Sequence, residues 1–454
     1  MERGSRRRSA GSAGRRPAPA CLLRGLAALL AAAAAAPAHA LLGATDGPIG
    51  LDANVRSIAA AVGGVRIPGG PESADTTALS QTLLRAVVGG RPAPWLAFEL
   101  HAVEGVDYGS TRAGQETTPF SLLAGDLRYR ALDALWAQHT TDTLAVRLVL
   151  DRANVTVALP WADVTVGRQA ITFGKAYLWN PLDVFLPFDP RQFDQDYKPG
   201  VDAARVDVRL GRFSGLTLVG AAGRTLGTLA VLGGRTEQTG ADWFGSALLG
   251  RLYATRRGWD LSLQGGKVYG GYTVGGGASG EIGPIAVRLE TVDYRTGDSP
   301  PLLPPLDAAA LGVTGEPLVS GGASAVVGLG HRFESTLDIE LEYFRNGPGD
   351  PAALTASLLR FASGGLLALS RNLLGAVVSY ELLPILVGYV GGLVSLDDGS
   401  VQVQPRLVWS AADEIEVLAG AIVGIGPGPR SIADFRSEFG SFPDVGFVEA
   451  KWYF

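Results

Sequence analysis

Cysteine is almost missing from this 454-residue chain, and lysine is scarce. The one cysteine, Cys21, lies within the first 40 residues. Without those residues the chain has no cysteine, which excludes a disulfide framework and a thiolate metal site. Stretches with helical periodicity are also hard to find, which argues against a helical fold.

Histidine is equally rare, because only His101, His139 and His331 follow residue 40. His101 and Glu99 could face the same way on one strand and supply a catalytic base, but no nucleophile motif lies near them. The sequence has no glycine-rich phosphate loop and no cluster with metal-ligand spacing. We therefore expect no enzyme, no cofactor and no metal.

The first 40 residues have the layout of a secretory signal peptide. Seven arginines and one glutamate occur among them, an apolar run covers about 22–36, and "PAHA" ends at Ala40. This order predicts cleavage after Ala40 and a mature domain over 41–454. A retained membrane anchor is the alternative, but the apolar run is short and ends in small residues.

The mature chain is acidic and undivided. Without residues 1–40 it has 32 basic and 43 acidic residues, a net charge of −11. This balance argues against a nucleic-acid partner. No linker-like or low-complexity break divides 41–454, so we expect a single domain.

Only one mature stretch, 373–396, is apolar and long enough to be a membrane helix. Glu381 and Pro384 interrupt it, and at period two it reads as two strands around "ELLP". A chain without membrane helices can still span a bilayer as a closed barrel, since a barrel satisfies its whole backbone.

Alternation of apolar and polar side chains is the dominant pattern, as in "WDLSLQGG" and "TLDIELEYF". It predicts an all-β, transmembrane antiparallel β-barrel of about 18 strands, with 16 possible. The predicted strands lie near 51–62, 78–90, 95–107, 143–158, 162–174, 201–210, 214–224, 242–256, 259–269, 271–281, 285–295, 317–331, 335–346, 366–380, 384–397, 400–411, 414–425 and 446–454.

The links between these strands alternate in length. Each even-numbered strand is followed by a tight link such as "GRPAP" or "LLP", and most odd-numbered strands by a long one. Short periplasmic turns and long extracellular loops are typical of barrels in the outer membrane of Gram-negative bacteria. We therefore expect the outer face of the barrel to contact outer-membrane lipid. Five of the eight tryptophans fall beside proposed short turns or at the last strand, as an aromatic girdle would require: Trp95, Trp161, Trp259, Trp409 and Trp452.

The last ten residues, "VGFVEAKWYF", alternate up to a terminal aromatic. They predict a final strand that closes the sheet against the first one and leaves no edge. The ending is similar to the C-terminal signal of outer-membrane barrels, which implies that the barrel-assembly machinery reads Phe454. A secreted sandwich or solenoid is the alternative, although it does not require such turn asymmetry.

A barrel of this size has an aqueous interior, so function is expected on its inner face. The phase of the alternation places charges of both signs there. These residues are Arg147, Asp151, Arg205, Asp207, Arg209, Arg288, Glu290, Asp338, Glu340, Glu342, Arg406 and Lys451.

Residues 163–211 resemble the alginate-export outer-membrane porins and their relatives of unknown substrate. The match is an ordered set over about fifty residues, with "GRQ", a "NPLDVF" run and "DAARVD". Its members are Gly167, Arg168, Gln169, Gly174, Pro181, Asp183, Pro187, Pro190, Asp202 and Arg205. The resemblance implies a barrel of about eighteen strands with a polar, arginine-bearing pore narrowed by inward loops. The mixed charge of the expected lumen differs from that of an alginate exporter.

Residues 175–200 are predicted to form an inward constriction loop. Four prolines exclude a continuous helix or strand, and the aromatics would be costly on a solvated loop. We expect Asp183, Asp189 and Arg191 to line the passage, and Arg168 to pair with a loop carboxylate such as Asp183 or Asp189. An ordinary ordered surface loop is the alternative.

These patterns together favour a passive outer-membrane channel. Its solutes would be small polar or anionic molecules, or an exported saccharide. The alternatives are a non-transporting barrel, either a surface adhesin or a barrel hydrolase, and an uptake channel for hydrophobic solutes if the aromatic loop forms an apolar vestibule.

Overall fold

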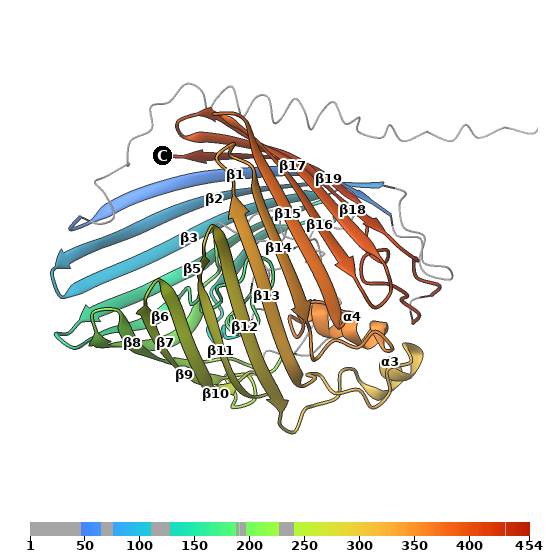
Figure 1. Cartoon of the computed structure of the whole chain (residues 1–454), viewed down its shortest axis with the longest axis horizontal. Helices are drawn as coiled ribbons and strands as arrows, with labels where there is room; N and C mark the ends of the chain where they lie inside the picture. The colour runs from blue at the N-terminus through green and yellow to red at the C-terminus, as the bar shows by residue number, and fades with distance from the viewer. Residues whose placement is uncertain are drawn as a thin grey trace, which may run out of the picture. The chain divides into compact units, whose positions relative to one another are not determined.

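Alternating side chains produce nineteen β-strands, in one antiparallel sheet, within the part of the chain that the structure describes (Figure 1). The computed structural model describes residues 47–64, 76–109, 128–187, 190, 197–226, 240–431 and 433–454. The predicted signal peptide, 1–40, lies outside these residues. The strands are β1 (Gly50–Gly63), β2 (Thr76–Ala93), β3 (Leu96–Gly109), β4 (Leu135–Thr140), β5 (Leu144–Ala158), β6 (Ala162–Gln169), β7 (Val201–Gly211), β8 (Ser214–Ala221), β9 (Ala247–Arg256), β10 (Trp259–Val268), β11 (Gly271–Ile282), β12 (Ile285–Thr296), β13 (Gly322–Arg332), β14 (Asp338–Arg345), β15 (Asn372–Leu383), β16 (Leu386–Ser395), β17 (Val401–Ala412), β18 (Ile415–Ile425) and β19 (Val445–Tyr453).

The sheet closes on itself as an 18-strand barrel. Strand β1 pairs with β2 on one side and with β19 on the other, so the first and last strands meet as predicted. The terminal Phe454 donates its backbone N–H to the carbonyl of Ala53, 2.9 Å away. Strand β4 is additional to the barrel: it pairs with the first half of β5, beyond the part of β5 that pairs with β6.

The two faces of the sheet differ in character, as strand periodicity requires. On one face Leu374 and Val390 are 43 % and 53 % exposed, whereas on the opposite face Leu373 and Leu393 are buried. The first face is the outer face of the barrel. The second is the inner face, and the register of β14 to β17 places Glu340, Glu342 and Arg406 on it.

Connections follow the predicted asymmetry. The links after β2, β5, β7, β9, β11, β13, β15 and β17 are tight, and most of those at the other end are long. Among the described residues two long links contain short helices, α3 (Pro305–Ala310) and α4 (Leu354–Ala362), which the sequence did not predict. No helix in the described part of the chain is long and apolar enough to cross a membrane.

All eighteen predicted strands are present, with corrections at several ends. Three begin later than expected, at Ala247, Gly322 and Asn372, and β4 lies within a segment predicted as loop. The predicted strand 162–174 ends at Gln169. Its apolar alternation continues through Ile171 and Phe173, but those side chains are buried in an interior cluster instead of facing outward.

Candidate functional site

After Gln169 the chain leaves the sheet and crosses to inner-face residues of distant strands. We call residues 170–187 the inward segment. Glu290 on β12 accepts hydrogen bonds from the backbone N–H groups of Lys175, Ala176 (3.1 Å) and Leu182 (3.2 Å). Its side chain is almost fully buried, so the three N–H groups take the place of water around the carboxylate.

Glu342 on β14 holds the part of the same segment that lies between Ala176 and Leu182. Its carboxylate oxygens accept hydrogen bonds from the N–H groups of Tyr177 (2.8 Å), Leu178 (3.1 Å) and Trp179 (2.7 Å). Hydrogen bonds from N–H groups to a charged carboxylate are stronger than those between neutral groups. Two wall carboxylates therefore fix six backbone groups of the inward segment.

Glycines of the inner face form sockets for this segment. A Cβ at Gly375 would lie 2.3 Å from Leu178 Cδ1, and one at Gly275 would lie 2.8 Å from Leu182 Cδ2. Both distances are shorter than van der Waals contact, so only glycine lets the segment approach this closely. Trp179 stacks on Phe344 of β14, with ring centroids 5.4 Å apart.

A buried ion pair closes the segment. The ammonium of Lys198 donates to the carboxylate of Asp183, and both side chains are almost fully buried. Burial raises the pKa of Asp183 to about 6, although the nearby Lys198 opposes this shift. The next residue toward β6, Leu182, accepts a hydrogen bond at its carbonyl from Gln264 of β10, 2.7 Å away.

The expected pairing of Arg168 with Asp183 is wrong, because Asp183 binds Lys198 and Arg168 binds Asp202. Asp189, the other expected partner, lies outside the described residues. The guanidinium of Arg168 binds both carboxylate oxygens of Asp202, at 2.7 and 3.0 Å. Arg168 and Asp202 face each other directly across β6 and β7, so the nearest acidic group is on the neighbouring strand. Arg168 also donates to the carbonyls of Leu132 and Leu150, so four of its five N–H groups have acceptors.

A second buried pair lies beside the first. Arg130 binds Asp151 and donates to the carbonyl of Gly200, 2.9 Å away. The N–H of Leu132 donates to Asp202, 2.8 Å away. This network joins 128–134 to the point where the chain returns to β7, and so it fixes both ends of the excursion into the interior.

Replacing Arg168 with Gln should therefore destabilise the barrel. Breaking a buried ion pair costs about 3–5 kcal/mol, because the remaining charge stays buried without its partner. The matched control is Arg209→Gln: Arg209 binds Asp163 at 2.5 Å, but its side chain is 49 % exposed. That change should cost less than about 1 kcal/mol. Urea unfolding of the inserted barrel, followed by tryptophan fluorescence, measures both, and equal losses would contradict the assignment.

A basic cluster occupies the inner face of β2, β3 and β5. The guanidinium carbons of Arg85 and Arg152 lie 3.3 and 4.5 Å from the ring centroid of Tyr197. Arg152 also binds Glu99 at 3.1 Å, and His101 Nε2 lies 2.7 Å from the same carboxylate. Among the described residues Arg85 makes no ion pair, so the cluster has an excess of positive charge.

The other predicted lining residues are mostly paired across or along strands. Arg147 binds Asp107, Arg205 binds Asp207 at 2.7 Å, and Arg288 binds Glu340. Arg406 lies over the ring of Tyr389, 4.3 Å from its centroid. The predicted lining residues Asp189 and Arg191 lie outside the described residues. No group of three or more potential metal ligands occurs in the described ranges.

Sequence reasoning missed Arg85, Arg130 and Tyr197. Arg85 had a usable signal, because "TLLRAVV" places it on the inner face between Leu83 and Val87 of β2. Arg130 and Tyr197 lie outside strands, and their position depends on long-range contacts that no local pattern shows.

Comparisons with known proteins place the fold. No protein-family model and no curated protein matches the chain. Among solved structures, Pseudomonas aeruginosa OccK11 (OpdR) has a TM-score of 0.51 at 12% identity, covering 91% of this chain and 99% of that one. Acinetobacter baumannii OccAB1 has a TM-score of 0.52 at 8% identity, covering 91% of this chain and 98% of that one. The outer membrane protein opdK from Pseudomonas aeruginosa has a TM-score of 0.51 at 11% identity, covering 89% of this chain and 98% of that one. The chain shares its barrel fold with these proteins.

Proposed function

We propose that this chain is an outer-membrane channel for passive passage of small polar solutes, with a preference for anions. The observation that carries the proposal is a closed 18-strand barrel whose inner face bears charged side chains and an inward segment seated on wall glutamates. A fold shared with an outer membrane protein supports the location. Residues 1–40 would serve as the secretory signal peptide.

The predicted lining residues divide by burial into two roles. Arg205, Asp207, Arg209, Arg288 and Arg406 keep part of their side chains exposed, and we assign them to the passage wall. We assign the buried members a holding role, because their charges are taken up by protein partners: Arg147, Asp151, Arg168, Asp183 and Glu290. Segment 175–200, with Asp189 and Arg191, is the proposed constriction.

The preference for anions follows from the basic cluster. Wall carboxylates such as Glu290 and Glu342 accept N–H groups of the inward segment, which offsets their field. Arg85 makes no ion pair among the described residues, although the carboxylate of Asp151 interacts with it electrostatically. Asp151 is itself bound to Arg130, so the cluster keeps an excess of positive charge. A cation in a confined passage acts strongly on a solute, because low-dielectric walls focus its field.

Changing Arg85 to Gln should reduce selectivity for anions. The measurement is the reversal potential of single channels in a planar bilayer under a KCl gradient. The matched control is Arg295→Gln, which removes the same charge from a side chain that is 83% exposed. Arg295 lies at the end of β12 that is far from the short β11–β12 turn. We expect a clear shift toward cations for Arg85→Gln and little change for the control. Equal reversal potentials would contradict the role of Arg85.

A saccharide is the second candidate solute. The observation that favours it is the ordered set from Gly167 to Arg205, which resembles alginate-export porins. Tyr177, with the Arg288 guanidinium 5.8 Å from its ring centroid, offers a ring face and donors of the kind that sugars use. Swelling of proteoliposomes in small carboxylates and in neutral oligosaccharides of similar size separates the two candidates.

Phe454 is the proposed signal to the barrel-assembly machinery. Its ring lies 4.0 Å from that of Trp452, and its N–H bonds to β1, so it ends the closing strand. Deleting Phe454 should lower the amount of folded barrel while secretion continues. Gel mobility with and without boiling measures assembly, and a periplasmic fractionation measures secretion. Normal assembly of the truncated chain would contradict the role.

A further inference from the structure

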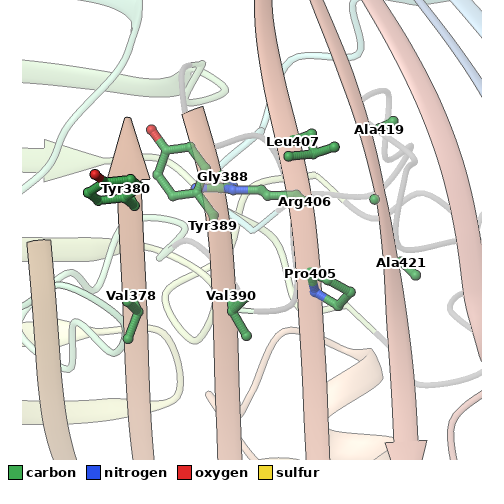
Figure 2. A pocket seen from close by; sticks show the side chains of 11 residues that line it. Val378, Tyr380, Gly388, Tyr389, Val390, Pro405, Arg406, Leu407, Ala419 and Ala421 are labelled. Carbon is green, nitrogen blue, oxygen red and sulfur yellow. The ribbon is translucent and has the colours of Figure 1, made fainter. Parts of the chain in front are cut away.

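The outer face of β15–β18 contains an apolar hollow with a volume of about 540 Å³ (Figure 2). Most of its lining residues share one face of the four strands: Val378, Tyr380, Gly388, Val390, Pro405, Leu407, Ala419 and Ala421. Three further lining residues, Tyr389, Arg406 and Gly420, alternate with these along the strands and belong to the opposite face. A volume of this size falls within the range of about 300–1,000 Å³ that is usual for ligand pockets.

Strand register shows that the hollow faces away from the barrel interior. Tyr380, Gly388, Leu407 and Ala419 are consecutive partners in one row across the four strands. Directly opposed residues share a face, so this row is on the outer face with Leu374 and Val390. The hollow is therefore open to whatever surrounds the barrel.

The hollow lies in the half of the barrel nearest the short turns. Tyr380 precedes Pro384 of the β15–β16 turn by four residues, which corresponds to about 13 Å along the strand. The apolar band of outer-membrane barrels is about 25 Å tall. Trp409 of β17, 46% exposed, lies between the hollow and the next short turn, where an interfacial aromatic belongs.

We propose that the hollow holds one acyl chain of a zwitterionic, amine-bearing phospholipid of the periplasmic leaflet. The inference rests on the outer-membrane location in the proposed function. In that location hydrocarbon must cover this face, and a void there would forfeit dispersion contacts on one side. A flexible chain can enter the hollow, whereas a second barrel would present a convex outer face to it.

Charge at the headgroup level selects the lipid class. The β17–β18 turn carries Asp413 and Glu414, and the β15–β16 turn, 383–386, carries no charged residue. Neither turn contains a basic side chain. Acidic groups attract an ammonium and repel an anionic headgroup, so phosphatidylethanolamine fits this position and phosphatidylglycerol does not.

The test compares lipid retention by two matched variants of the full-length mature barrel. Gly388→Leu adds a side chain at a residue that lines the hollow. Gly392→Leu adds the same side chain to the same face of β16, where a Cβ meets nothing within 4 Å. Each protein is inserted into nanodiscs of equimolar phosphatidylethanolamine and phosphatidylglycerol, released into detergent and examined by native mass spectrometry. Ala421→Leu serves as a second filling variant if Gly388→Leu does not fold.

We expect wild type and Gly392→Leu to retain one phosphatidylethanolamine, and Gly388→Leu to retain it with about tenfold lower occupancy. Three results would each overturn the inference. They are equal retention by all three proteins, preferential retention of phosphatidylglycerol, and a wild-type protein that is a lipid-free dimer while Gly388→Leu is a monomer. Failure of wild type to insert at all would count against the proposed function instead, and it is detected separately by gel mobility before and after boiling.

Discussion

Replacing residues 178–196 with a short Gly/Ser linker is expected to raise single-channel conductance severalfold and to weaken ion selectivity. The replaced part of the inward segment buries Leu178, Trp179, Leu182 and Phe185 against the inner face. Each well-buried side chain of this kind contributes about 1.5–3 kcal/mol, which holds the segment inside against its ordering entropy. Without it the interior gains solvent, and wall charges lie further from a passing ion.

The barrel should still assemble in that variant, because strand pairing from β7 to β19 and back to β1 does not involve the replaced residues. Conductance of both forms is compared at equal salt, after gel mobility has shown that each is folded. Unchanged conductance in a correctly inserted variant would show that the passage is narrowed elsewhere, with the long 110–134 link between β3 and β4 as the next candidate.

Glu342→Gln is expected to release the inward segment without deleting it. The carboxylate now accepts the N–H groups of Tyr177, Leu178 and Trp179. An amide has only one acceptor oxygen, and its NH2 group would oppose those donors. An unsatisfied buried polar group costs about 1–3 kcal/mol, so the segment should leave its seat for part of the time. We expect higher mean conductance and more open-channel noise.

Glu340→Gln is the matched control. Glu340 is on the same strand and the same face, two residues away, but it binds Arg288 and not the inward segment. Its loss should change selectivity through the freed guanidinium and leave the noise at the wild-type level. Identical noise in the two variants would mean that Glu342 does not hold the segment.

The strand pattern was predictable because a barrel imposes two different environments on alternate residues. In stretches such as 335–346 the alternation is visible in the sequence itself: Leu341 faces outward, and Glu340 and Glu342 face inward. Turn asymmetry and the closing strand were predictable for the same reason, since they follow from the membrane-spanning arrangement and need no long-range contact.

The end of β6 was not predictable in this way. Ile171 and Phe173 continue the apolar alternation, yet they are buried in the interior. The two-residue alternation of apolar side chains therefore continues past the end of the strand. An extended chain that packs on an interior cluster shows the same alternation as a strand that faces lipid. Gly167 was the one local signal. Its φ of 120° and the Ala153 oxygen, 2.2 Å from a hypothetical Cβ, restrict it to glycine two residues before the strand ends.

Partner identity was the other limit. Arg168 was expected to pair with a carboxylate of the loop that follows it. Its partner is Asp202, which is 34 positions later in the sequence and faces it on the neighbouring strand β7. The partners of Glu342 were not predictable either. The alternation of its strand marks it as inward, but its carboxylate binds backbone N–H groups of the inward segment. Such pairs depend on how the interior is filled, and a single sequence does not contain that information in a local form.

If the folded barrel is a channel, the wild-type protein conducts ions, and single-channel recording in a planar bilayer detects this. Purified mature protein is added at low concentration to a bilayer in symmetric KCl, and the reversal potential is then measured under a KCl gradient. We expect discrete, ohmic current steps with a reversal potential biased toward chloride. Verified insertion without any current, or a current that strongly favours potassium, would contradict this expectation.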